Sequence, residues 1–461
     1  MENDILNAFK AYDIRGESPE PINAEFAYKL GKAVVEAINP KKVLVGKDMR
    51  LTSPELEDSL VKSLIEQGVE VIKIGLCSTP VFNVLMGLNQ GKVDLGIMIT
   101  ASHNPGKYNG FKFTNSLVQP IGLDSGLDKV RDVFLTASEK SQVSNIGAVE
   151  EDKNALDRYV DFVIEKVELP DDMKKINVVI DAGNGMAGLV VPKVLKKLTW
   201  LQAEELYFNL DGNFPNHEAN PIKPETMTDL IAKVKETGAD MGIAFDGDAD
   251  RIGFVDEKGE QIPGDILTAL FAKIQLKKFK GGKVVYDVRS SWTVPHTIEQ
   301  AGGESDMYVV GSAMIKRHMQ KEGAVFGGEM SMHYYFKEFW NVESGDYAML
   351  VLMKYLQETG KKLSEIWKPL QKYFSSGEIN FEVKDKDATL EKILNEYKSD
   401  ATQFSDMDGL RFEFGDPKIG EAWWFNLRKS NTEPLIRLNL EATSEELKNE
   451  KIEELSNLIN G

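Results

Sequence analysis

The stretch Met241-Gly-Ile-Ala-Phe-Asp-Gly-Asp-Ala-Asp-Arg251 joins a short apolar run to three carboxylates at alternate positions. The apolar run predicts a buried strand, and the alternation lets the side chains of Asp246, Asp248 and Asp250 converge on one point. Three anions so close together repel one another unless a cation lies between them. Oxygen ligands without nearby Cys or His favour a hard divalent ion, Mg²⁺ before Zn²⁺. The stretch therefore predicts a strand that ends in a metal-binding loop, and a protein that handles phosphate.

The acidic stretch has three other interpretations. An EF-hand loop counted from Asp246 would have its glutamate at Glu257, but Arg251 stands where the sharp turn needs glycine. The EF-hand therefore does not fit. A D-x-D phosphatase also starts with an apolar strand, and a solvated acidic turn contains the same residue types. Both of these stay open on this stretch alone.

The plan of a strand that ends in a polar loop recurs three times. Each repeat begins with an apolar strand followed by aspartate, and these strands are expected at 42–46, 177–180 and 283–286. A helix and a second strand follow, and a third strand leads into a polar loop at 100–105, 246–251 or 327–333. Open α/β sheets bind ligands at the carboxyl ends of their strands. The repetition predicts three similar α/β domains with mixed, mainly parallel sheets.

The pattern changes near residue 373. Short strands are expected at 378–383, 410–414, 423–427 and 435–440, before a final helix. Thr443 and Glu446 form a capping-box pair that predicts the start of this helix. These features predict a smaller α+β domain. The expected domains are 1–152, 153–260, 261–372 and 373–461.

Composition and charge limit the class of partner. A chain of 461 residues is too long for one ordinary core, and its formal net charge of −18 argues against a nucleic acid or an anionic membrane surface. The single cysteine, Cys77, excludes an intrachain disulfide and suits a reducing compartment. We expect no secretory signal and no membrane span. A cytoplasmic protein with a small-molecule partner is the prediction.

The loop Thr100-Ala-Ser-His-Asn-Pro105 is a candidate catalytic site. Ser102 could be a nucleophile or a phosphate carrier, and His103 could move protons or donate to phosphate oxygens. Lys112 follows shortly and could return to the same pocket. The stretch 10–16 adds further cations and a phenol. The alternative is a plain Ser/Asn turn with a surface histidine.

The stretch Arg428-Lys-Ser-Asn-Thr-Glu-Pro-Leu-Ile-Arg437 has the composition of a phosphate cradle. A guanidinium offers paired donors, and the hydroxyls and amide add neutral ones. An ordinary polar hairpin is the alternative. The stretch Gly183-Asn-Gly-Met-Ala-Gly188 matches a dinucleotide-binding fingerprint, but the neighbouring repeats lack such glycines. A tight turn between strand and helix is the preferred interpretation there.

Together these loops resemble the α-D-phosphohexomutase superfamily, and most closely its phosphomannomutase/phosphoglucomutase branch. The resemblance extends over the whole chain and is carried by five motifs in family order, at 11–16, 100–105, 246–251, 328–331 and 428–432. It implies four domains around a central cleft. It also implies that Ser102 carries a phosphoryl group and that Mg²⁺ is held by Asp246, Asp248, Asp250 and that phosphate.

The resemblance assigns further roles. His103 and Lys112 are implied in proton transfer, and Arg15 and Arg251 in charge stabilisation. The substrate-binding residues that it implies are Tyr12, Arg289, Ser312, Glu329, Ser331, Arg428, Ser430, Asn431, Thr432 and Arg437. Mannose and glucose phosphates are the implied substrates, hexose 1,6-bisphosphate the implied intermediate and activator, and a monomer or weak dimer the implied state.

Three departures from the family pattern bear on the choice of sugar. Met332 replaces a glycine, Ser312 or Ala313 stands where many members have histidine, and Arg289 stands where many have lysine. Phosphoglucosamine mutase is therefore kept as an alternative, although Met330 argues against it. A sugar phosphatase of the D-x-D type and a non-catalytic sugar-phosphate-binding protein are more distant alternatives.

Overall fold

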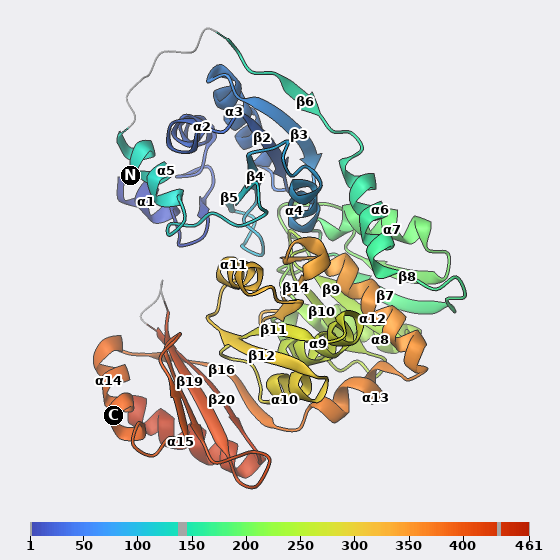
Figure 1. Ribbon diagram of the computed structural model, residues 1–461, viewed down its shortest axis with the longest axis vertical. Helices are drawn as coiled ribbons and strands as arrows, with labels where there is room; N and C mark the ends of the chain where they lie inside the picture. Colours follow the sequence, from blue (N-terminus) through green and yellow to red (C-terminus); the bar gives the residue numbers. More distant parts are fainter. Residues whose placement is uncertain (1, 137–144, 431–434, 461) are drawn as a thin grey trace. The chain divides into compact units, whose positions relative to one another are not determined.

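The computed structural model (Figure 1) describes residues 2–136, 145–430 and 435–460. The chain forms two compact units. The first unit contains residues 1–262, 316–321 and 331–364. The second contains residues 263–315, 322–330 and 365–461.

The first unit begins with helix α1 (Glu2–Ala8) and a six-stranded mixed sheet. In sheet order the strands are β1 (Ile14–Glu17), β5 (Tyr108–Asn115), β4 (Leu95–Ile99), β2 (Lys42–Lys47), β3 (Glu70–Leu76) and β6 (Val149–Glu151). Strand β5 runs antiparallel to β1 and β4, and the remaining pairs are parallel. One face is covered by α2 (Ala24–Ile38), α3 (Ser53–Glu66) and α5 (Leu127–Thr136). Helix α4 (Thr79–Leu88) packs on β4, where Gly96 leaves room for Phe82 and Met86.

A second sheet of the first unit has the order β10 (Ile252–Asp256), β9 (Met241–Phe245), β7 (Ile176–Asp181) and β8 (Leu201–Leu206). Its helical elements are α6 (Ala155–Val167), α7 (Ala187–Lys197), η1 (Pro224–Met227) and α8 (Thr228–Thr237). Strand β9 is buried throughout and runs antiparallel only to β10. Gly242 lets Leu230 and Val234 of α8 approach it closely. Because β9 is so tightly packed, the acidic loop that follows it starts from a fixed position.

The rest of the first unit comes from later in the chain. It contains β14 (Tyr334–Phe336), η2 (Lys337–Phe339), β15 (Val342–Glu343), α12 (Gly345–Thr359) and residues 316–321 of α11 (Ser312–Glu322). The buried Tyr159 hydroxyl on α6 hydrogen-bonds to Ser344 Oγ at 2.9 Å and Asp346 Oδ2 at 2.8 Å. These bonds fasten α12 to the second sheet's helices.

The second unit contains two groups of strands. The first group is β12 (Gly303–Tyr308), β11 (Gly282–Asp287) and β13 (Phe326–Gly328), all parallel, with α9 (Gly264–Phe279) and α10 (Thr293–Gln300). Helix α13 (Leu363–Trp367) and η3 (Lys368–Leu370) lead to an antiparallel sheet. Its order is β16 (Phe374–Glu382), β20 (Leu435–Ala442), β19 (Trp423–Lys429), β18 (Leu410–Phe414) and β17 (Gln403–Ser405).

The antiparallel sheet has one apolar and one polar face. Helices α14 (Lys386–Tyr397) and α15 (Glu445–Asn460) pack on the apolar face around Phe412, Phe425 and Leu438 (Figure 1). The opposite face carries polar side chains in register, including the pairs Asn426–Asn439 and Arg428–Arg437 on β19 and β20. Asn426 and Asn439 are buried, whereas Arg428 and Arg437 are partly exposed, so the accessible part of this face is its arginine end.

The predicted fold class is confirmed: three domains are α/β with mixed, mainly parallel sheets, and the C-terminal domain has an antiparallel sheet. The capping-box prediction is wrong by one residue. Helix α15 begins at Glu445, and the hydroxyl of Ser444 accepts the amide of Leu447 at 3.1 Å. Thr443 Oγ1 is engaged elsewhere, because it accepts the amide of Ala422 at 3.1 Å.

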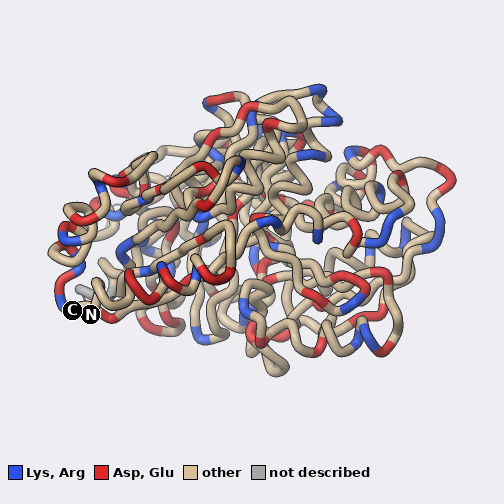
Figure 2. The backbone as a smooth tube through the Cα atoms, turned by 90° about the horizontal axis from the view of Figure 1, so that it is seen from below, with Lys and Arg blue, Asp and Glu red and all other residues tan. Residues whose placement is uncertain are grey.

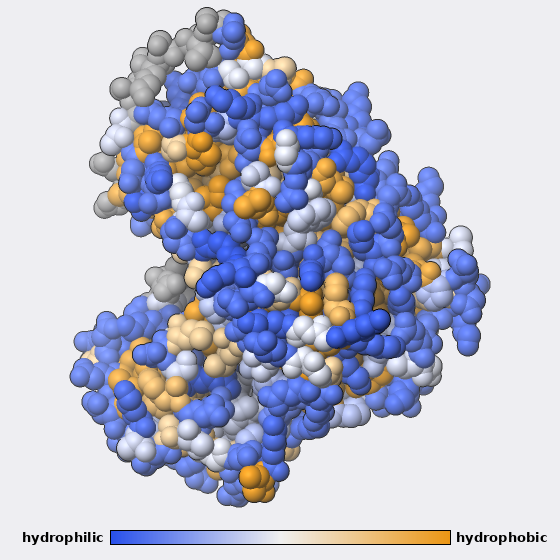
Figure 3. Space-filling view, in the orientation of Figure 1, coloured by the Kyte–Doolittle hydropathy of each residue, from blue (hydrophilic) through white to orange (hydrophobic). Residues whose placement is uncertain are grey.

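Charged residues of both signs are interspersed along the chain (Figure 2), and the face drawn in Figure 3 is mostly hydrophilic with apolar groups in small areas. None of the helices that the structure describes is both long and apolar enough to cross a bilayer.

Candidate active site

The serine loop (residues 100–107) joins β4 to β5 and buries Ser102. This residue is 4% exposed and has a left-handed backbone conformation, with φ 53°. Its amide donates to Thr100 Oγ1 at 2.9 Å. Its Oγ lies 3.2 Å from His103 Nδ1 and 3.3 Å from Asp246 Oδ2. The hydroxyl therefore lies between an imidazole and the acidic loop.

Arg50 holds the serine loop in place, although it was not among the residues predicted from the sequence. Its buried guanidinium donates to four carbonyl oxygens at 2.6–2.9 Å, those of Ser102, Asn104, Pro105 and Tyr108. Its Nε donates to Asp48 Oδ2 at 3.1 Å. The sequence feature that could have pointed to Arg50 is the aspartate that follows the first strand of each repeat. In the first repeat this aspartate, Asp48, anchors the arginine two residues later.

The acidic loop (residues 246–251) follows β9 and brings its three carboxylates together. Asp246, Asp248 and Asp250 are buried, and one oxygen from each lies within 4.8 Å of the others. Asp248 Oδ2 accepts from Thr79 Oγ1 at 2.6 Å. Asp248 Oδ1 is buried and has no hydrogen-bond partner among the residues that the structure describes. An all-oxygen set with an unsatisfied buried oxygen fits a hard divalent cation.

The charge of the acidic loop is partly balanced by Lys112 on β5. Its Nζ lies 2.7 Å from Asp248 Oδ2 and 2.8 Å from Asp250 Oδ2. Burial alone would lower the pKa of Lys112, but the two carboxylates raise it, so the ammonium is retained. Burial and the neighbouring Asp250 and Asp248 raise the pKa of Asp246 well above its usual range. One ammonium is thus not enough to neutralise three buried carboxylates.

Two further groups predicted from the sequence flank Ser102. The pKa of His103 is well below its usual range because of burial and because Arg251 and Arg15 are nearby, so the imidazole is neutral. Arg15 Nη1 donates to Asn104 Oδ1 at 2.8 Å, within the serine loop. Burial acts to lower the pKa of Arg15, but nearby carboxylates, Asp13 first, raise it. The site therefore combines a neutral imidazole with permanent cations.

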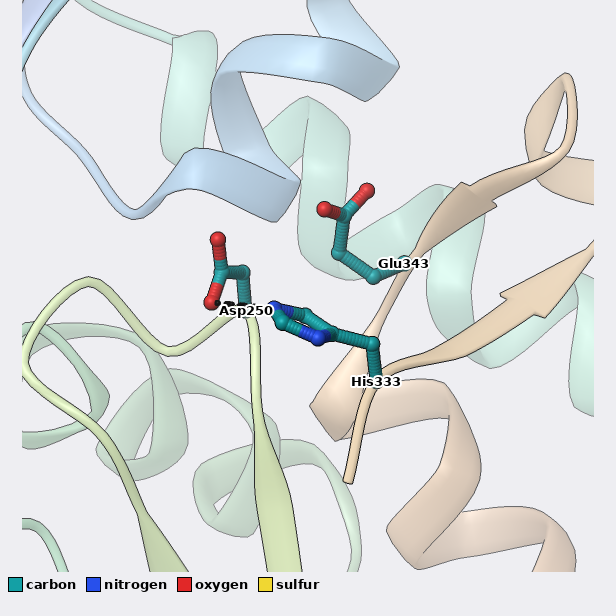
Figure 4. Close-up of side chains that lie close together, drawn as sticks. All are labelled: Asp250, His333 and Glu343. Carbon is teal, nitrogen blue, oxygen red and sulfur yellow. Dashed lines mark ion pairs between the residues drawn. The ribbon is translucent and has the colours of Figure 1, made fainter. Parts of the chain in front are cut away.

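His333 is a second histidine of the site, and it was not predicted as a site residue. Its Nε2 lies 3.3 Å from Asp250 Oδ1 (Figure 4). The same nitrogen lies 3.3 Å from Arg251 Nε. Glu343 approaches the same point from β15 (Figure 4), but both of its oxygens are bound by Lys316 Nζ, at 2.9 and 3.0 Å. This pairing makes the group of Asp250, His333 and Glu343 a poorer cation site than the three aspartates.

The glycine-rich stretch 183–188 supports the acidic loop. The amide of Met186 donates to the carbonyl oxygen of Gly247 at 2.9 Å. A Cβ at Gly185 would lie only 2.7 Å from that oxygen, so a larger residue would push the two loops apart. Gly183 has φ 53°, which glycine adopts readily. The glycines therefore serve the turn after β7 and its close packing against the acidic loop.

The second unit gathers other predicted residues around Asp287, at the end of β11. Arg289 Nη2 donates to Asp287 Oδ2 at 2.8 Å, and the amide of Met330 donates to the same oxygen at 2.9 Å. Glu329 is buried, and its Oε1 accepts the amide of Gly311 at 3.0 Å. Asp287 and Glu329 thus join the loops that follow β11, β12 and β13.

Arg428 lies at the end of β19 in the same unit. Its Nε donates to Asp408 Oδ1 at 2.9 Å. Arg437 pairs with it across the two strands, and Arg437 Nη1 lies 3.7 Å from Glu378 Oε1. The carbonyl oxygen of Ser430 accepts from Lys386 Nζ at 2.8 Å. This end of the polar sheet face is therefore rich in cations.

Models of the phosphoglucomutase/phosphomannomutase family match four successive segments of the chain. The α/β/α domains I, II and III match residues 6–140, 157–259 and 263–373, and the C-terminal domain matches 378–458. The chain belongs to this family.

Individual relatives agree with the family match. A protein of Methanocaldococcus jannaschii named phosphomannomutase is 40% identical over 463 residues, which cover 100% of this chain and 98% of that protein. A Xanthomonas campestris pv. campestris protein named "Phosphohexose mutases" is 39% identical over 458 residues, 99% and 100% of the two chains. The crystal structure of a family protein from Burkholderia thailandensis has a TM-score of 0.87 at 32% identity and covers 98% of this chain and 96% of its own.

The family membership confirms the resemblance drawn from the five motifs. Within the first unit the structure brings together Ser102, His103, Lys112, Arg15, Arg251, the three aspartates and Ser331, whose Oγ lies 3.0 Å from His333 Nδ1. Tyr12 is 38% exposed. Ser312 begins α11. The predicted residues Asn431 and Thr432 lie outside the described residues.

Proposed function

We propose that this phosphoglucomutase/phosphomannomutase family member interconverts hexose 1-phosphates and hexose 6-phosphates of mannose and glucose. A phosphoryl group on Ser102 would be the carrier, and a bisphosphorylated hexose the intermediate. The observation that carries the proposal is the position of Ser102 Oγ, 3.2 Å from a neutral imidazole and 3.3 Å from the acidic loop. The full-length relatives named as phosphohexose mutases and phosphomannomutases support it.

Transfer in one direction moves the phosphoryl group from Ser102 to the free hydroxyl of the sugar phosphate. The phosphorus–Oγ bond breaks and a bond to the sugar oxygen forms, while the sugar hydroxyl loses its proton to a base and Ser102 Oγ takes up a proton as it leaves. In the return step Ser102 Oγ attacks, and its proton can pass to His103 Nδ1, which lies 3.2 Å away. Phosphoryl transfer depends mainly on positioning and charge neutralisation. Lys112, Arg15 and Arg251 supply fixed positive charge beside the serine.

The carboxylates of Asp246, Asp248 and Asp250, together with the Ser102 phosphate, would hold Mg²⁺. When bound, the ion would supply further neutralisation of the phosphoryl oxygens. The unsatisfied Asp248 Oδ1 and the raised pKa of Asp246 both fit a cation at this point.

Substrate recognition is assigned to three groups of residues. Glu329 and Ser331 would bind sugar hydroxyls, and Tyr12, Arg289 and Ser312 would contact the substrate. Arg428, Ser430, Asn431, Thr432 and Arg437 would hold the phosphate that is not reacting. Hexose 1,6-bisphosphate, the intermediate after its release, would rephosphorylate Ser102 and so act as an activator.

The proposal includes a cytoplasmic location and a monomer or weak dimer. The single cysteine supports the location, because Cys77 is buried and forms no disulfide.

The test is an assay of phosphate transfer between positions 1 and 6 on mannose, glucose and glucosamine phosphates, followed by ³¹P NMR. We expect interconversion of the mannose and glucose phosphates, without net release of inorganic phosphate. Release of inorganic phosphate from every sugar would indicate a phosphatase instead. Turnover of glucosamine phosphate alone would assign the chain to the phosphoglucosamine mutases, and binding without turnover would indicate a binding protein.

A further inference from the structure

Asp408 lies between two loops that the proposed function assigns to the substrate. It precedes β18, and its two carboxylate oxygens have different partners. Oδ1 accepts from Arg428 Nε at 2.9 Å, and Oδ2 accepts the amide of Val310 at 2.8 Å. All three residues belong to the second unit. One carboxylate thus connects the end of β19 with the loop between β12 and α11.

We propose that Asp408 is a positioning residue that orients Arg428 for the non-reacting phosphate and couples it to the sugar-binding loops. This inference rests on the proposed function, because it takes Arg428 as a phosphate ligand. It adds a residue that is absent from the five motifs.

The geometry of the guanidinium carries the first part of the inference. Arginine offers its donors in a rigid plane, so a bond at Nε fixes the direction of the other two nitrogens. Within the described residues, Nη1 and Nη2 of Arg428 form no hydrogen bond. The side chain is 19% exposed, so these donors remain accessible to a ligand. Asp408 therefore leaves the paired edge that suits a phosphate unoccupied.

The backbone of residues 310–311 connects Asp408 to the sugar-binding loops. The amide of Val310 donates to Asp408, and the next amide, of Gly311, donates to Glu329 Oε1 at 3.0 Å. Two consecutive amides thus bind the carboxylate behind Arg428 and the carboxylate assigned to the sugar hydroxyls. A shift of Asp408 would also displace Glu329, because one short segment directly before Ser312 binds both carboxylates.

Gly409 makes the close approach possible. It has φ 74°, and a Cβ there would lie 2.1 Å from the carbonyl oxygen of Leu427 and 2.8 Å from Arg428 Cγ. A residue with a side chain would separate this loop from β19. The glycine therefore lets Asp408 reach the Nε of Arg428.

The direction of the change in phosphate affinity distinguishes a positioning role of Asp408 from a purely electrostatic one. Asp408 is an anion near the proposed phosphate site, so charge alone predicts that its neutralisation strengthens phosphate binding. Positioning predicts the opposite, because Asp408→Asn loses the charge-assisted bond that orients Arg428. The two explanations therefore differ in direction.

The experiment measures the binding of mannose 6-phosphate to the full-length protein by calorimetry, with KM and kcat for the same variants. We expect Asp408→Asn to weaken binding and raise KM about ten-fold, which is typical for loss of a partner that orients a ligand-binding group, with a smaller change in kcat. Asp406→Asn is the matched control, because it makes the same charge change on an exposed residue of the same loop. In an Arg428→Ala background, the loss of binding caused by Asp408→Asn should be much smaller, because only the effect through residues 310–311 remains.

Unchanged or tighter binding in Asp408→Asn, or an equal loss in the Arg428→Ala background, would overturn the inference. If the asparagine variant fails to fold, Asp408→Glu keeps the charge, displaces the guanidinium and should weaken binding in the same way. The binding cycle does not need turnover. A wild-type protein without mutase activity would therefore contradict the proposed function and leave the test of Asp408 intact.

Discussion

At the scale of single residues, Ser102 stands out by its backbone conformation. Its φ of 53° lies in the left-handed region, which costs a residue other than glycine about 1–2 kcal/mol. Two hydrogen bonds hold it there. The Ser102 amide donates to Thr100 Oγ1, and Arg50 donates to the Ser102 carbonyl oxygen. Such strain is common where a side chain must point to one place. Here it directs Oγ toward His103 and Asp246.

Ser102→Ala should reduce kcat by roughly 10³-fold or more, since removal of a nucleophile typically has an effect of this size or larger. The fold should persist, because the loop is held through backbone atoms of its neighbours. Intact-mass analysis of active wild-type protein should show one phosphate, and peptide mapping should place it on Ser102. An alanine variant with full activity would contradict the phosphoserine mechanism.

Asp248→Asn tests the acidic loop as a metal site. The change removes one of three converging charges, so Mg²⁺ should bind at least about ten-fold more weakly, and activity should fall with it. The dependence of rate on Mg²⁺ concentration measures this, and Mn²⁺ binding followed by electron paramagnetic resonance gives a readout without turnover. Wild-type activity that survives exhaustive chelation would mean that the carboxylates only form an acidic turn.

Arg428→Ala separates binding from chemistry. Loss of a charge-assisted contact costs about 1.5–3 kcal/mol, or roughly ten- to a hundred-fold in affinity, so KM should rise by that factor. The bisphosphorylated intermediate should also escape, so that Ser102 loses its phosphate over repeated turnovers and added hexose 1,6-bisphosphate restores the rate. Lys429→Ala is the control, because this neighbouring cation is exposed and pairs with Asp387. A normal KM in Arg428→Ala would exclude this residue as the phosphate clamp.

At the scale of elements, the serine loop and the acidic loop are each fixed by a neighbouring segment. Arg50, just after β2, binds three carbonyl oxygens of the serine loop and that of Tyr108 at the start of β5. The glycine-rich turn after β7 binds the acidic loop through Gly247. In both cases the first strand of a repeat ends next to the loop that follows the third strand. The parallel order of these strands brings the two ends to the same edge of the sheet.

Arg50→Lys tests this support. Lysine keeps the charge beside Asp48, but a single ammonium cannot satisfy four carbonyl oxygens at once. We expect kcat to fall about 100-fold, the size typical of a misplacement near 1 Å, while sugar-phosphate binding changes little. Steady-state kinetics with calorimetry measures both. Arg131→Lys on α5 is the control, because among the described residues Arg131 pairs only with its neighbour Asp132.

At the scale of the whole molecule, the chain divides into two compact units. The first holds the serine loop and the acidic loop, and the second holds Arg428 and Glu329. Inside the second unit, Trp292 and Trp424 pack together near Glu441. The amide of Trp292 and Nε1 of Trp424 both donate to Glu441 Oε1, at 3.0 and 2.9 Å. This buried carboxyl therefore joins the start of α10 to the antiparallel sheet.

The stability of the second unit should depend on pH through Glu441. Burial raises its pKa to about 7 in the folded protein, above the ordinary value of 4.5. Between these two values the folded state keeps a proton that the unfolded state releases, so the free energy of unfolding falls as pH rises. The contribution of Glu441 to the free energy of unfolding that is lost over this pH range is roughly 3 kcal/mol. It is fully present below pH 4.5 and absent above pH 7.

Glu441→Gln should remove this dependence. Urea unfolding followed by tryptophan fluorescence at several pH values measures the difference in unfolding free energy between variant and wild type. That difference should shift in favour of the variant as pH rises from about 4.5 to 7. Glu446→Gln, at an exposed position on α15, is the control. A difference that stays constant over this range would contradict the raised pKa of Glu441.

The sequence by itself determined the family, the fold class and most of the residues that the structure brings together around Ser102. Loops at the carboxyl ends of buried strands are recognisable because strand burial and loop polarity are both local properties of the chain. The three aspartates of 246–251 illustrate this, since their alternation after an apolar run already implied that they converge.

Only the tertiary structure decided which distant groups meet. Lys112 lies 136 residues from Asp248, and their ion pair depends on how two sheets pack. Three other interactions are equally non-local. They are the hydrogen bonds from Arg50 to four carbonyl oxygens, the contact of His333 with Asp250 and the hydrogen bond from Arg428 to Asp408. The physical reason is that the energy of a charge pair depends on distance in space, whereas the sequence records only separation along the chain.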